Sequence, residues 1–540
     1  MKPPGQTAAR WDYIVVGAGS AGAIVASRLS EDLTCRVLLL EAGGPADQAR
    51  FRIPTLAAMK AYGDPDCDWL IETEADPTRL GKKEVWYRGK VLGGSSSING
   101  TIYVRGNRGD YDHWARLGNI GWDYESLLTY FRRQERGVGE IAGGYGPGGP
   151  VHISKPRGVP KLTHVFIDAM RELGVPTNPR YNGIEQTGAS VVHLNQHRGT
   201  RESTAHSYLR PASRRPNLCV LTRAVARRIV FEGKRAVGVE YDQDGNTKRD
   251  FSSRDIILSA SVINTPKLLM LSGIGDPGDL RAHGIEVLHA NPAVGRNLQE
   301  HPAVPIKAHV NTRTTNMDIG PWGQAKIALQ WALTRGGPAT FSWSAIAFVK
   351  SDAGLEHPDL QFHFGTFATE ELTSRGVKWA DRPAVSMLVN VNRSSSSGYV
   401  KLKSRDPLAP ALVQPNMLAD QREVDLLEKG VTFGRKVWRT AAFAPYFLDE
   451  FEAVKCIDGA DGALEGFVRR EAGTAYHACG TARMGVGAGA VVDPRLRVMG
   501  VENLRIIDCS IIPRVPSGNT NAVSMVIGEK GADMVKEDSR

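Results

Sequence analysis

Short apolar runs alternate with a helical repeat near the start of the chain. Residues 13–16 (YIVV) have the pattern of a buried strand, residues 21–29 have helical periodicity, and residues 36–40 form a second apolar run. Strands that alternate with helices are typical of a parallel sheet covered by helices. The pattern therefore predicts an α/β fold that begins with a strand–helix–strand unit.

Three glycines separate the first strand from the helix at G-x-G-x-x-G spacing. Gly17 permits a tight turn, Gly19 lets the backbone approach a pyrophosphate, and Gly22 lets helix and strand pack closely. Glu41, at the end of the second strand, can accept hydrogen bonds from ribose hydroxyls. The unit predicts dinucleotide binding, with the pyrophosphate at the helix N-terminus. The pattern by itself does not distinguish FAD from NAD.

Later segments predict a chain that leaves this domain and returns to it. Alternating runs between residues 219 and 260 predict antiparallel strands, and residues 306–464 mix strands with a helical stretch at 421–442. Residues 504–507 form another buried-strand pattern that ends at Asp508, an acid that could contact the cofactor. We therefore expect two domains, the second of α+β type. The segments are 1–160, 196–305 and 465–540 for the cofactor domain, and 161–195 and 306–464 for the substrate domain.

Composition narrows the class of protein. The 540 residues are 41% hydrophobic and 23% charged, as in a globular protein, and no window approaches the length of a membrane span. The six cysteines are scattered and the N-terminus has no apolar signal core, which favours free thiols, no metal site and a cytoplasmic location. The net charge is +9, but adjacent basic residues occur in pairs and not in a long basic tract. We therefore expect a mildly basic surface and no nucleic-acid partner.

A glycine- and serine-rich segment makes a more specific comparison possible. Residues 89–112, with Gly93, Gly94, Ser95 and Asn99, resemble the first signature of the glucose–methanol–choline (GMC) family of flavin oxidoreductases. Residues 261–275 resemble the second signature, although Val262 replaces a smaller residue, and residues 295–301 resemble a further family segment. The similarity covers nearly the whole chain. It implies a Rossmann-type FAD domain, and it decides for FAD as the cofactor.

The resemblance also implies roles for residues further along the chain. Val225 falls where relatives offer backbone groups to the adenine ring. A final amphipathic helix begins near Asn521, and its positive end would face the flavin and stabilise the reduced anion. Ile98 occupies a position where some members carry a histidine that attaches FAD covalently. We therefore expect FAD to be bound without a covalent link.

Two residues near the C-terminus are candidates for catalysis. Residues 477–485 are similar to the family's H-x-x-G-T-x-x-M-G segment, whose histidine lies over the flavin, and this places His477 at the reacting centre. The family's second position, histidine or asparagine, falls on Asn519. A histidine can take the hydroxyl proton of an alcohol, while an asparagine can orient the alcohol without taking a proton.

The substrate pocket is expected around Trp343, Ser344 and His363. His363 resembles a pocket histidine of choline-oxidising members, whereas Ser344 replaces the glutamate that those members use for the ammonium group. These features favour a primary alcohol with an aromatic or heteroaromatic ring over choline. The other histidines considered (His113, His197, His206 and His301) are expected to be structural or at the surface.

Several alternatives stay open. A choline-type or aliphatic alcohol dehydrogenase has the same motifs, and a hydroxynitrile lyase or a light-driven decarboxylase can use the same fold. A non-catalytic flavin-binding protein is a further alternative. We expect the electron acceptor to be O2 or another acceptor, such as a quinone-like molecule or a protein.

Overall fold

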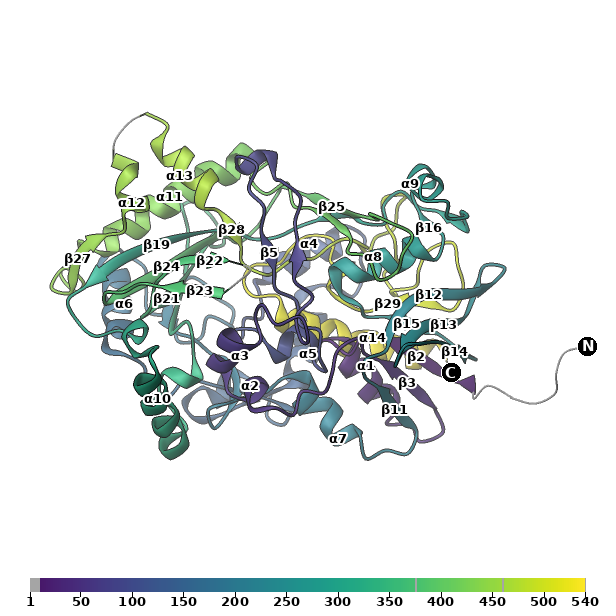
Figure 1. Cartoon of the computed structure of the whole chain (residues 1–540). Helices are drawn as coiled ribbons and strands as arrows, with labels where there is room; N and C mark the ends of the chain where they lie inside the picture. The colour runs from purple at the N-terminus through teal and green to yellow at the C-terminus, as the bar shows by residue number, and fades with distance from the viewer. Residues whose placement is uncertain (1–9, 374–375, 459–460, 540) are drawn as a thin grey trace, which may run out of the picture.

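The computed structural model describes residues 10–373, 376–458 and 461–539. The chain forms two lobes that lie side by side, each built on its own sheet (Figure 1). The N-terminal strands and the end of the chain lie together in one lobe. The second lobe holds the middle of the chain.

The first lobe is built on a five-stranded sheet of order β11-β3-β2-β15-β29. Its strands are β2 (Tyr13–Val16), β3 (Val37–Leu40), β11 (Leu218–Leu221), β15 (Ile256–Leu258) and β29 (Leu504–Ile506). All neighbouring pairs are parallel, and every residue of β2, β3, β15 and β29 is buried. Strands buried on both faces read as continuous apolar runs. The predicted Rossmann-type α/β fold is confirmed.

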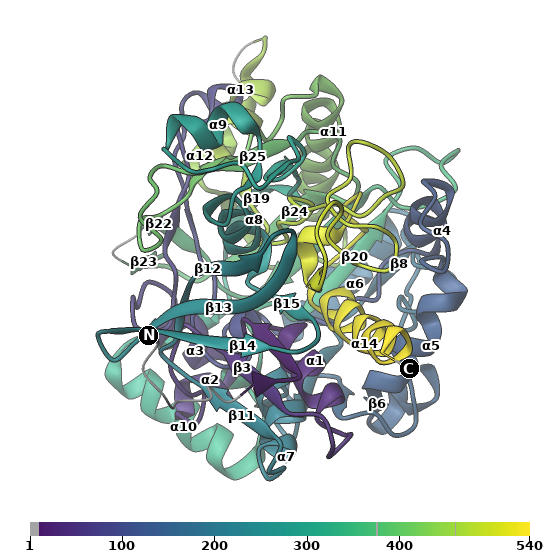
Figure 2. The same ribbon diagram turned by 90° about the vertical axis from the view of Figure 1, so that its right-hand side faces the viewer.

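Two helices from opposite ends of the chain pack together on this lobe. Helix α1 (Gly22–Leu29) connects β2 to β3, and α14 (Asn521–Asp538) lies beside both α1 and α5 (Tyr124–Gln134), as Figure 2 shows. A side chain at Gly528 would meet the backbone of Ala21 at 2.8 Å, so this glycine allows the close approach of α14 to α1. The C-terminal helix is thereby fixed against the glycine turn.

The strands predicted between residues 219 and 260 divide between two sheets. β12 (Val225–Glu232), β13 (Arg235–Gln243) and β14 (Asn246–Ser252) form the expected antiparallel meander. Residues 218–221 pair in parallel with β3, and residues 256–258 pair in parallel with β2, so the antiparallel prediction was wrong for these two strands. Runs of three or four residues are too short to distinguish the two kinds of pairing by periodicity.

The second lobe is an antiparallel sheet of order β27-β19-β24-β21-β20-β8, with β28 also paired to β19. Its strands are β8 (Gly188–Val191), β19 (Pro302–Val310), β20 (Ala345–Val349), β21 (Leu360–Gly365), β24 (Ala384–Val391), β27 (Phe447–Glu450) and β28 (Gly473–Thr474). Helices α6 (Lys161–Glu172) and α11 (Gln421–Val437) pack on it. Residues 398–401 form β25 in a separate sheet with β18 (Arg296–Leu298) and β26 (Leu412–Gln414).

The two faces of this antiparallel sheet have different neighbours. Side chains alternate between the faces of a strand, and Ile306 and Val389 pack against glycines of α11. On the opposite face, Lys307, His363 and Leu388 line a cavity. The antiparallel sheet thus supplies one wall of a space whose other wall is the parallel sheet. Within the described residues, no helix combines the length and apolar character needed to cross a bilayer.

Candidate active site

One cavity of about 1210 Å³ lies between the two lobes. Its lining comes from the ends of the parallel strands, the serine-rich segment, the open face of the antiparallel sheet and the start of α14. Ligand pockets are usually about 300–1,000 Å³. The cavity is larger than that, so it has room for a dinucleotide together with a small second molecule.

The glycine turn after β2 is shaped by close backbone contacts. Gly17 has φ +99°, and a Cβ there would be 2.4 Å from the Ser259 carbonyl oxygen. A Cβ at Gly22 would be 2.0 Å from the Gly17 carbonyl oxygen, whereas a Cβ at Gly19 would meet nothing within 4 Å. Gly17 and Gly22 are therefore required by the fold. Gly19 leaves open space on the cavity side, where a phosphate can approach the backbone.

Two buried carboxylates lie at the ends of parallel strands. Glu41 accepts hydrogen bonds from the backbone N–H groups of Ala18 and Gly43, both at 2.8 Å, and burial raises the pKa of its carboxyl to about 7. Asp508 accepts from the Ser261 N–H at 3.0 Å and from the Thr265 hydroxyl at 2.6 Å, and burial raises its pKa as well. Both line the cavity.

The serine-rich segment forms a short 3₁₀ turn, η2 (Gly94–Ser97), against the glycine turn. A Cβ at Gly94 would be 2.7 Å from the Cα of Gly19, so the two glycine-rich segments touch. The Ser95 hydroxyl accepts from the Gly89 N–H at 3.2 Å, and the Asn99 side-chain oxygen accepts from the buried Arg201 at 2.8 Å. These contacts fix the segment along the cavity wall.

The structure brings most of the expected cofactor residues into one lining. Those that line the cavity are Gly17, Gly19, Glu41, Gly94, Ser95, Asn99, Val225, Asp508 and Asn521. Gly22 and Gly93 lie behind the lining, where they allow close packing. The Nδ2 of Asn521, at the N-terminus of α14, is buried and has no hydrogen-bond partner among the residues that the structure describes. A free donor at a helix N-terminus suits an anionic or carbonyl-bearing cofactor.

His477 and Asn519 meet in the same cavity. The His477 Nε2 and the Asn519 Nδ2 lie 3.0 Å apart, and the His477 Nδ1 lies 3.0 Å from the Nδ1 of His301. The His301 Nε2 lies 3.1 Å from the Asn392 carbonyl oxygen. A chain of four groups therefore runs from the backbone of residue 392 to the cavity.

This chain of contacts determines where the protons lie. A carbonyl oxygen only accepts, so the His301 Nε2 must carry a hydrogen and, in the neutral ring, its Nδ1 must accept. The His477 Nδ1 then donates, and the His477 Nε2 is left as the acceptor that faces Asn519. Burial lowers the pKa of His301 to about 4 and holds the pKa of His477 well below its ordinary value. Both rings are consequently neutral near pH 7.

The backbone that carries the two histidines is held by one carboxylate. Glu300 accepts from the backbone N–H groups of His301 and His477, each at 2.8 Å, and from the Thr474 hydroxyl at 2.8 Å. Sequence reasoning missed His301 and Glu300 as parts of the site. Their position inside the resembling segment 295–301 was the available signal, but nothing in that segment indicated contact with residue 477.

His363 lies on the other side of Asn519. Gln361 donates through its Nε2 to the Asn519 Oδ1 at 3.2 Å, and the same nitrogen lies 3.2 Å from the His363 Nε2. The His363 Nδ1 is then the N–H of a neutral ring. This nitrogen is buried and has no hydrogen-bond partner in the described part of the chain, although His363 lines the cavity. Burial lowers the pKa of His363 to about 4, so the ring is an uncharged donor.

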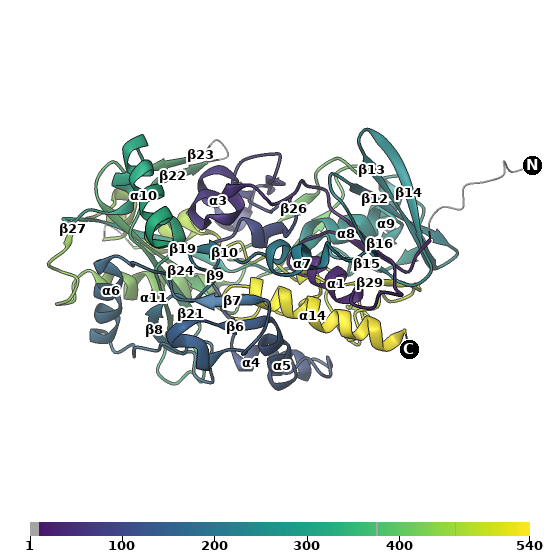
Figure 3. The same cartoon turned by 90° about the horizontal axis from the view of Figure 1, so that it is seen from below.

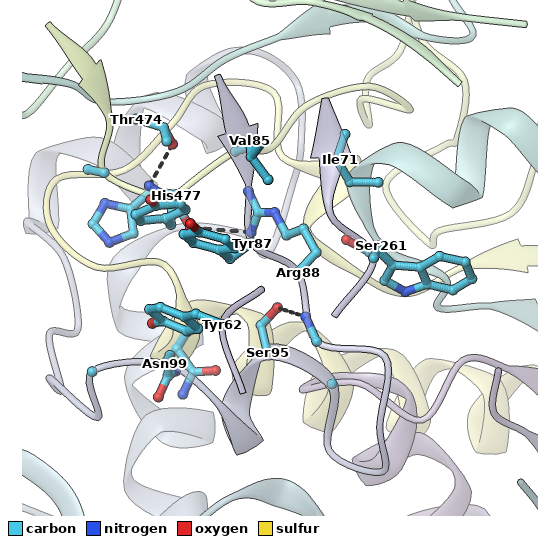
Figure 4. A pocket seen from close by; sticks show the side chains of 18 of the residues that line it. Tyr62, Ile71, Val85, Tyr87, Arg88, Ser95, Asn99, Ser261, Thr474 and His477 are labelled. Carbon is cyan, nitrogen blue, oxygen red and sulfur yellow. Dashed lines mark hydrogen bonds between the residues drawn. The ribbon is translucent and has the colours of Figure 1, made fainter. Parts of the chain in front are cut away.

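Aromatic side chains surround the reacting centre. Trp343 lies 5.9 Å from the His363 ring and 5.2 Å from Phe367, and Phe367 lies 6.0 Å from Trp379. All four residues line the cavity. On another wall, Tyr62 stacks on Tyr87 at 4.9 Å and Tyr87 on Tyr476 at 5.8 Å; Figure 4 shows Tyr62 and Tyr87 facing each other near Arg88 and His477.

Ser344 does not take part in this wall. Its side chain is buried, lies 2.8 Å from the Thr163 hydroxyl on α6, and is absent from the cavity lining. Trp343 and Ser344 are consecutive in an extended segment that leads into β20, so their side chains point to opposite faces. The assignment of Ser344 to the pocket does not agree with this placement, while Trp343 and His363 do lie in the lining.

Comparison with known proteins identifies the family of this chain. The family models described as GMC oxidoreductase match residues 11–303 and residues 394–528. The chain belongs to the GMC oxidoreductase family. This family is FAD-dependent, and the chain is an FAD-dependent oxidoreductase that acts on alcohol groups.

Relatives cover nearly the full length of the chain. Choline dehydrogenase, mitochondrial, from Mus musculus is 38% identical over 97% of this chain and 89% of its own length. The oxygen-dependent choline dehydrogenase of Brucella anthropi is 38% identical over 97% of this chain and 95% of its own. Among solved structures, pyridoxine 4-oxidase from Mesorbium loti has a TM-score of 0.87 at 28% identity, covering 97% of this chain and 99% of that one. A formate oxidase has a TM-score of 0.91 at 26% identity, covering 99% of both chains.

Proposed function

We propose that this GMC oxidoreductase oxidises a primary alcohol to the aldehyde, with His477 as the base and Asn519 as the orienting partner. The observation that carries the proposal is the geometry at His477, whose Nε2 has a lone pair that faces Asn519 inside the cavity. Bound FAD supplies the acceptor for the carbinol hydrogen, which leaves as hydride. The protein must therefore hold the alcohol and take its hydroxyl proton.

The hydrogen-bond chain supports proton transfer to one atom. An alcohol oxygen that displaces the direct contact between His477 and Asn519 would receive a hydrogen bond from the Asn519 amide and donate its own proton to the His477 Nε2. The O–H bond then breaks as the Nε2–H bond forms. His301 holds the Nδ1–H of the same ring, so the ring cannot turn its other nitrogen toward the substrate. The buried Glu300 accepts from the backbone N–H groups of His301 and His477, and it thereby helps to fix where both rings lie.

The cofactor residues fit FAD held without a covalent bond. Gly17, Gly19 and Glu41 would hold the adenosine and pyrophosphate part, and the unpartnered Nδ2 of Asn521 would donate to the flavin. Ile98, in the serine-rich segment, is buried with 2% exposure and has no nucleophilic atom. FAD should therefore dissociate when the protein is denatured.

Two classes of alcohol suit the aromatic wall. Trp343, Phe367 and Trp379 can pack on a flat aryl ring, and the same rings can hold a quaternary ammonium group by cation–π contact. The choline dehydrogenases at 38% identity favour choline. Ser344 lies outside the cavity lining, so it does not decide between the two classes. We propose both classes: the relatives support choline-type alcohols, and the aromatic wall also fits arylmethanols.

A panel of alcohols under argon tests the function. We expect the visible absorbance of oxidised flavin to bleach with choline or with arylmethanols such as benzyl alcohol, and the ratio of their kcat/KM values ranks the two classes. Readmitting air then separates oxidases from dehydrogenases by the rate at which the colour returns. A yellow protein that no alcohol bleaches would contradict the proposal and favour a lyase or decarboxylase on this fold.

A further inference from the structure

Helix α10 (Pro321–Thr334) stands apart from the rest of the molecule. It joins η5 (Thr315–Asp318) to η6 (Pro338–Thr340) in the connection between β19 and β20, and none of its residues is buried. Figures 1 and 3 show it projecting at the edge of the second lobe. Surface helices normally direct an apolar stripe toward the core, so a helix without any buried residue calls for an explanation.

The face of α10 that touches the protein is narrow. Gly323, Ile327 and Trp331 are its partly buried positions, and their spacing of four residues places them on one side of the helix. The Trp331 Nε1 donates to the Gly199 carbonyl oxygen at 2.8 Å, which anchors this side. The inward face is therefore fixed by one hydrogen bond and modest packing.

The opposite face carries the large apolar side chains. Trp322, Leu329 and Leu333 are 91%, 61% and 76% exposed. At about 100° per residue these three positions, together with Ala325 and Ala332, form one stripe on the side away from Trp331. The stripe is therefore directed outward, toward solvent. Contiguous apolar surface of this kind marks an interaction site.

Charge favours an anionic lipid surface as the partner. Residues 319–337 contain Lys326 and Arg335 and no acidic residue. Arg335 stacks on Trp331 at the inward side, at 4.2 Å, which leaves Lys326 as the basic side chain beside the stripe. Lys326 lies next to the apolar stripe, so a symmetric contact between two copies would bring like charges together. A helix with tryptophan and leucine on one face and a basic residue such as Lys326 beside them is typical of helices that lie in a membrane interface.

The length of α10 excludes a span and suits a position in the interface plane. At about 1.5 Å per residue, 14 residues extend about 21 Å, less than the hydrocarbon thickness of about 30 Å. The segments on either side of the helix reach the active site, since Thr315, Pro338 and Phe341 line the cavity. We propose that the outer face of α10 docks this enzyme on an anionic lipid surface, with the cavity beside the docked helix.

Cosedimentation with vesicles tests the docking. The full-length holoenzyme is mixed with phosphatidylcholine vesicles that contain or lack phosphatidylserine, and the bound fraction is measured. We expect binding that needs phosphatidylserine and falls with added salt. The variant Trp322→Ser/Leu329→Gln/Leu333→Gln should lower the partition coefficient by about tenfold or more, because the apolar contact is lost. Lys326→Glu/Arg335→Glu should abolish the preference for phosphatidylserine.

A matched control replaces exposed apolar residues elsewhere. Ile120→Ser/Ile184→Gln/Leu448→Gln alters side chains that are 86%, 89% and 55% exposed, and it should bind vesicles like the wild type. FAD content shows that each variant is folded, whatever the outcome for alcohol oxidation. Failure of the wild type to sediment with phosphatidylserine vesicles would overturn the proposal. So would equal binding by the α10 variant, or a dimer in solution that the α10 variant converts to monomers.

Discussion

At the scale of single residues, the site depends on which nitrogen of His477 carries hydrogen. The Asn392 carbonyl fixes the tautomer of His301, and His301 in turn fixes that of His477. The base is thereby presented as a bare Nε2 without any charged group in direct contact with it. A neighbouring backbone carbonyl, distant in sequence, thus determines the chemistry of the ring.

Replacing His301 tests this relay. His301→Leu removes the acceptor for the His477 Nδ1–H, so the ring loses its fixed orientation, and we expect kcat to fall by about tenfold to a hundredfold at unchanged FAD content. The neutral His301 ring accepts from the His477 Nδ1–H and thereby favours the protonated form of His477. Its loss should lower the pKa of His477, and the acid limb of kcat/KM should move to lower pH, because the base must be unprotonated.

The conservative variant separates positioning from packing. Glutamine can accept from the His477 Nδ1–H and donate to the Asn392 carbonyl, so His301→Gln should recover much of the activity lost in His301→Leu. His164→Gln, at an exposed position on α6, serves as the control. If His301→Leu retained the wild-type kcat and pH profile, the relay would have no role in the reaction.

At the scale of elements, different glycines of the turn between β2 and α1 serve folding and cofactor binding. Gly22 is packed against the Gly17 carbonyl, whereas Gly19 faces open space. The sequence predicted β2, α1 and β3 to within one or two residues, because short-range periodicity determines them. It did not indicate that α10 would direct its apolar stripe outward. Periodicity shows which residues share one face of a helix, but it does not show whether that face points to the core or to solvent.

Alanine substitutions at the two glycines should therefore differ. Gly22→Ala should lower the melting temperature, with a loss of about 1–3 kcal/mol or more in the free energy of unfolding, because backbone atoms must move. Gly19→Ala should fold normally in the absence of cofactor but bind FAD more weakly, as measured by bound flavin absorbance. Gly148→Ala, where a Cβ meets nothing, is the control. Equal FAD affinity in Gly19→Ala and the wild type would contradict the assigned pyrophosphate position.

At the scale of the whole molecule, the cavity exists only where the two sheets meet. The face of β19, β21 and β24 opposite α11 closes the space above the parallel sheet, and α14 brings Asn519 to His477 from the end of the chain. The sequence indicated both catalytic candidates through the resemblance to the family. It could not supply Gln361, Asn392 or Glu300, because only tertiary contacts bring these residues to the two candidates.

The sequence-based assignment of pocket residues was also wrong for one of two consecutive residues whose side chains point in opposite directions. Trp343 and Ser344 were both placed in the pocket, yet one lines the cavity and the other contacts α6. The direction of a strand face depends on what packs against it, and residues 343 and 344 carry no alternation strong enough to show this. The preference for an aromatic alcohol rested partly on Ser344, so the identity of the alcohol stays a proposal.

The rate of flavin bleaching under argon in the wild type and in His477→Ala tests the central claim most directly. With saturating alcohol, we expect His477→Ala to bind FAD normally and to be reduced about 10² to 10⁴ times more slowly, because the positioned base is lost. His164→Gln should match the wild type. Reduction of His477→Ala at the wild-type rate would contradict the assignment of His477 as the base.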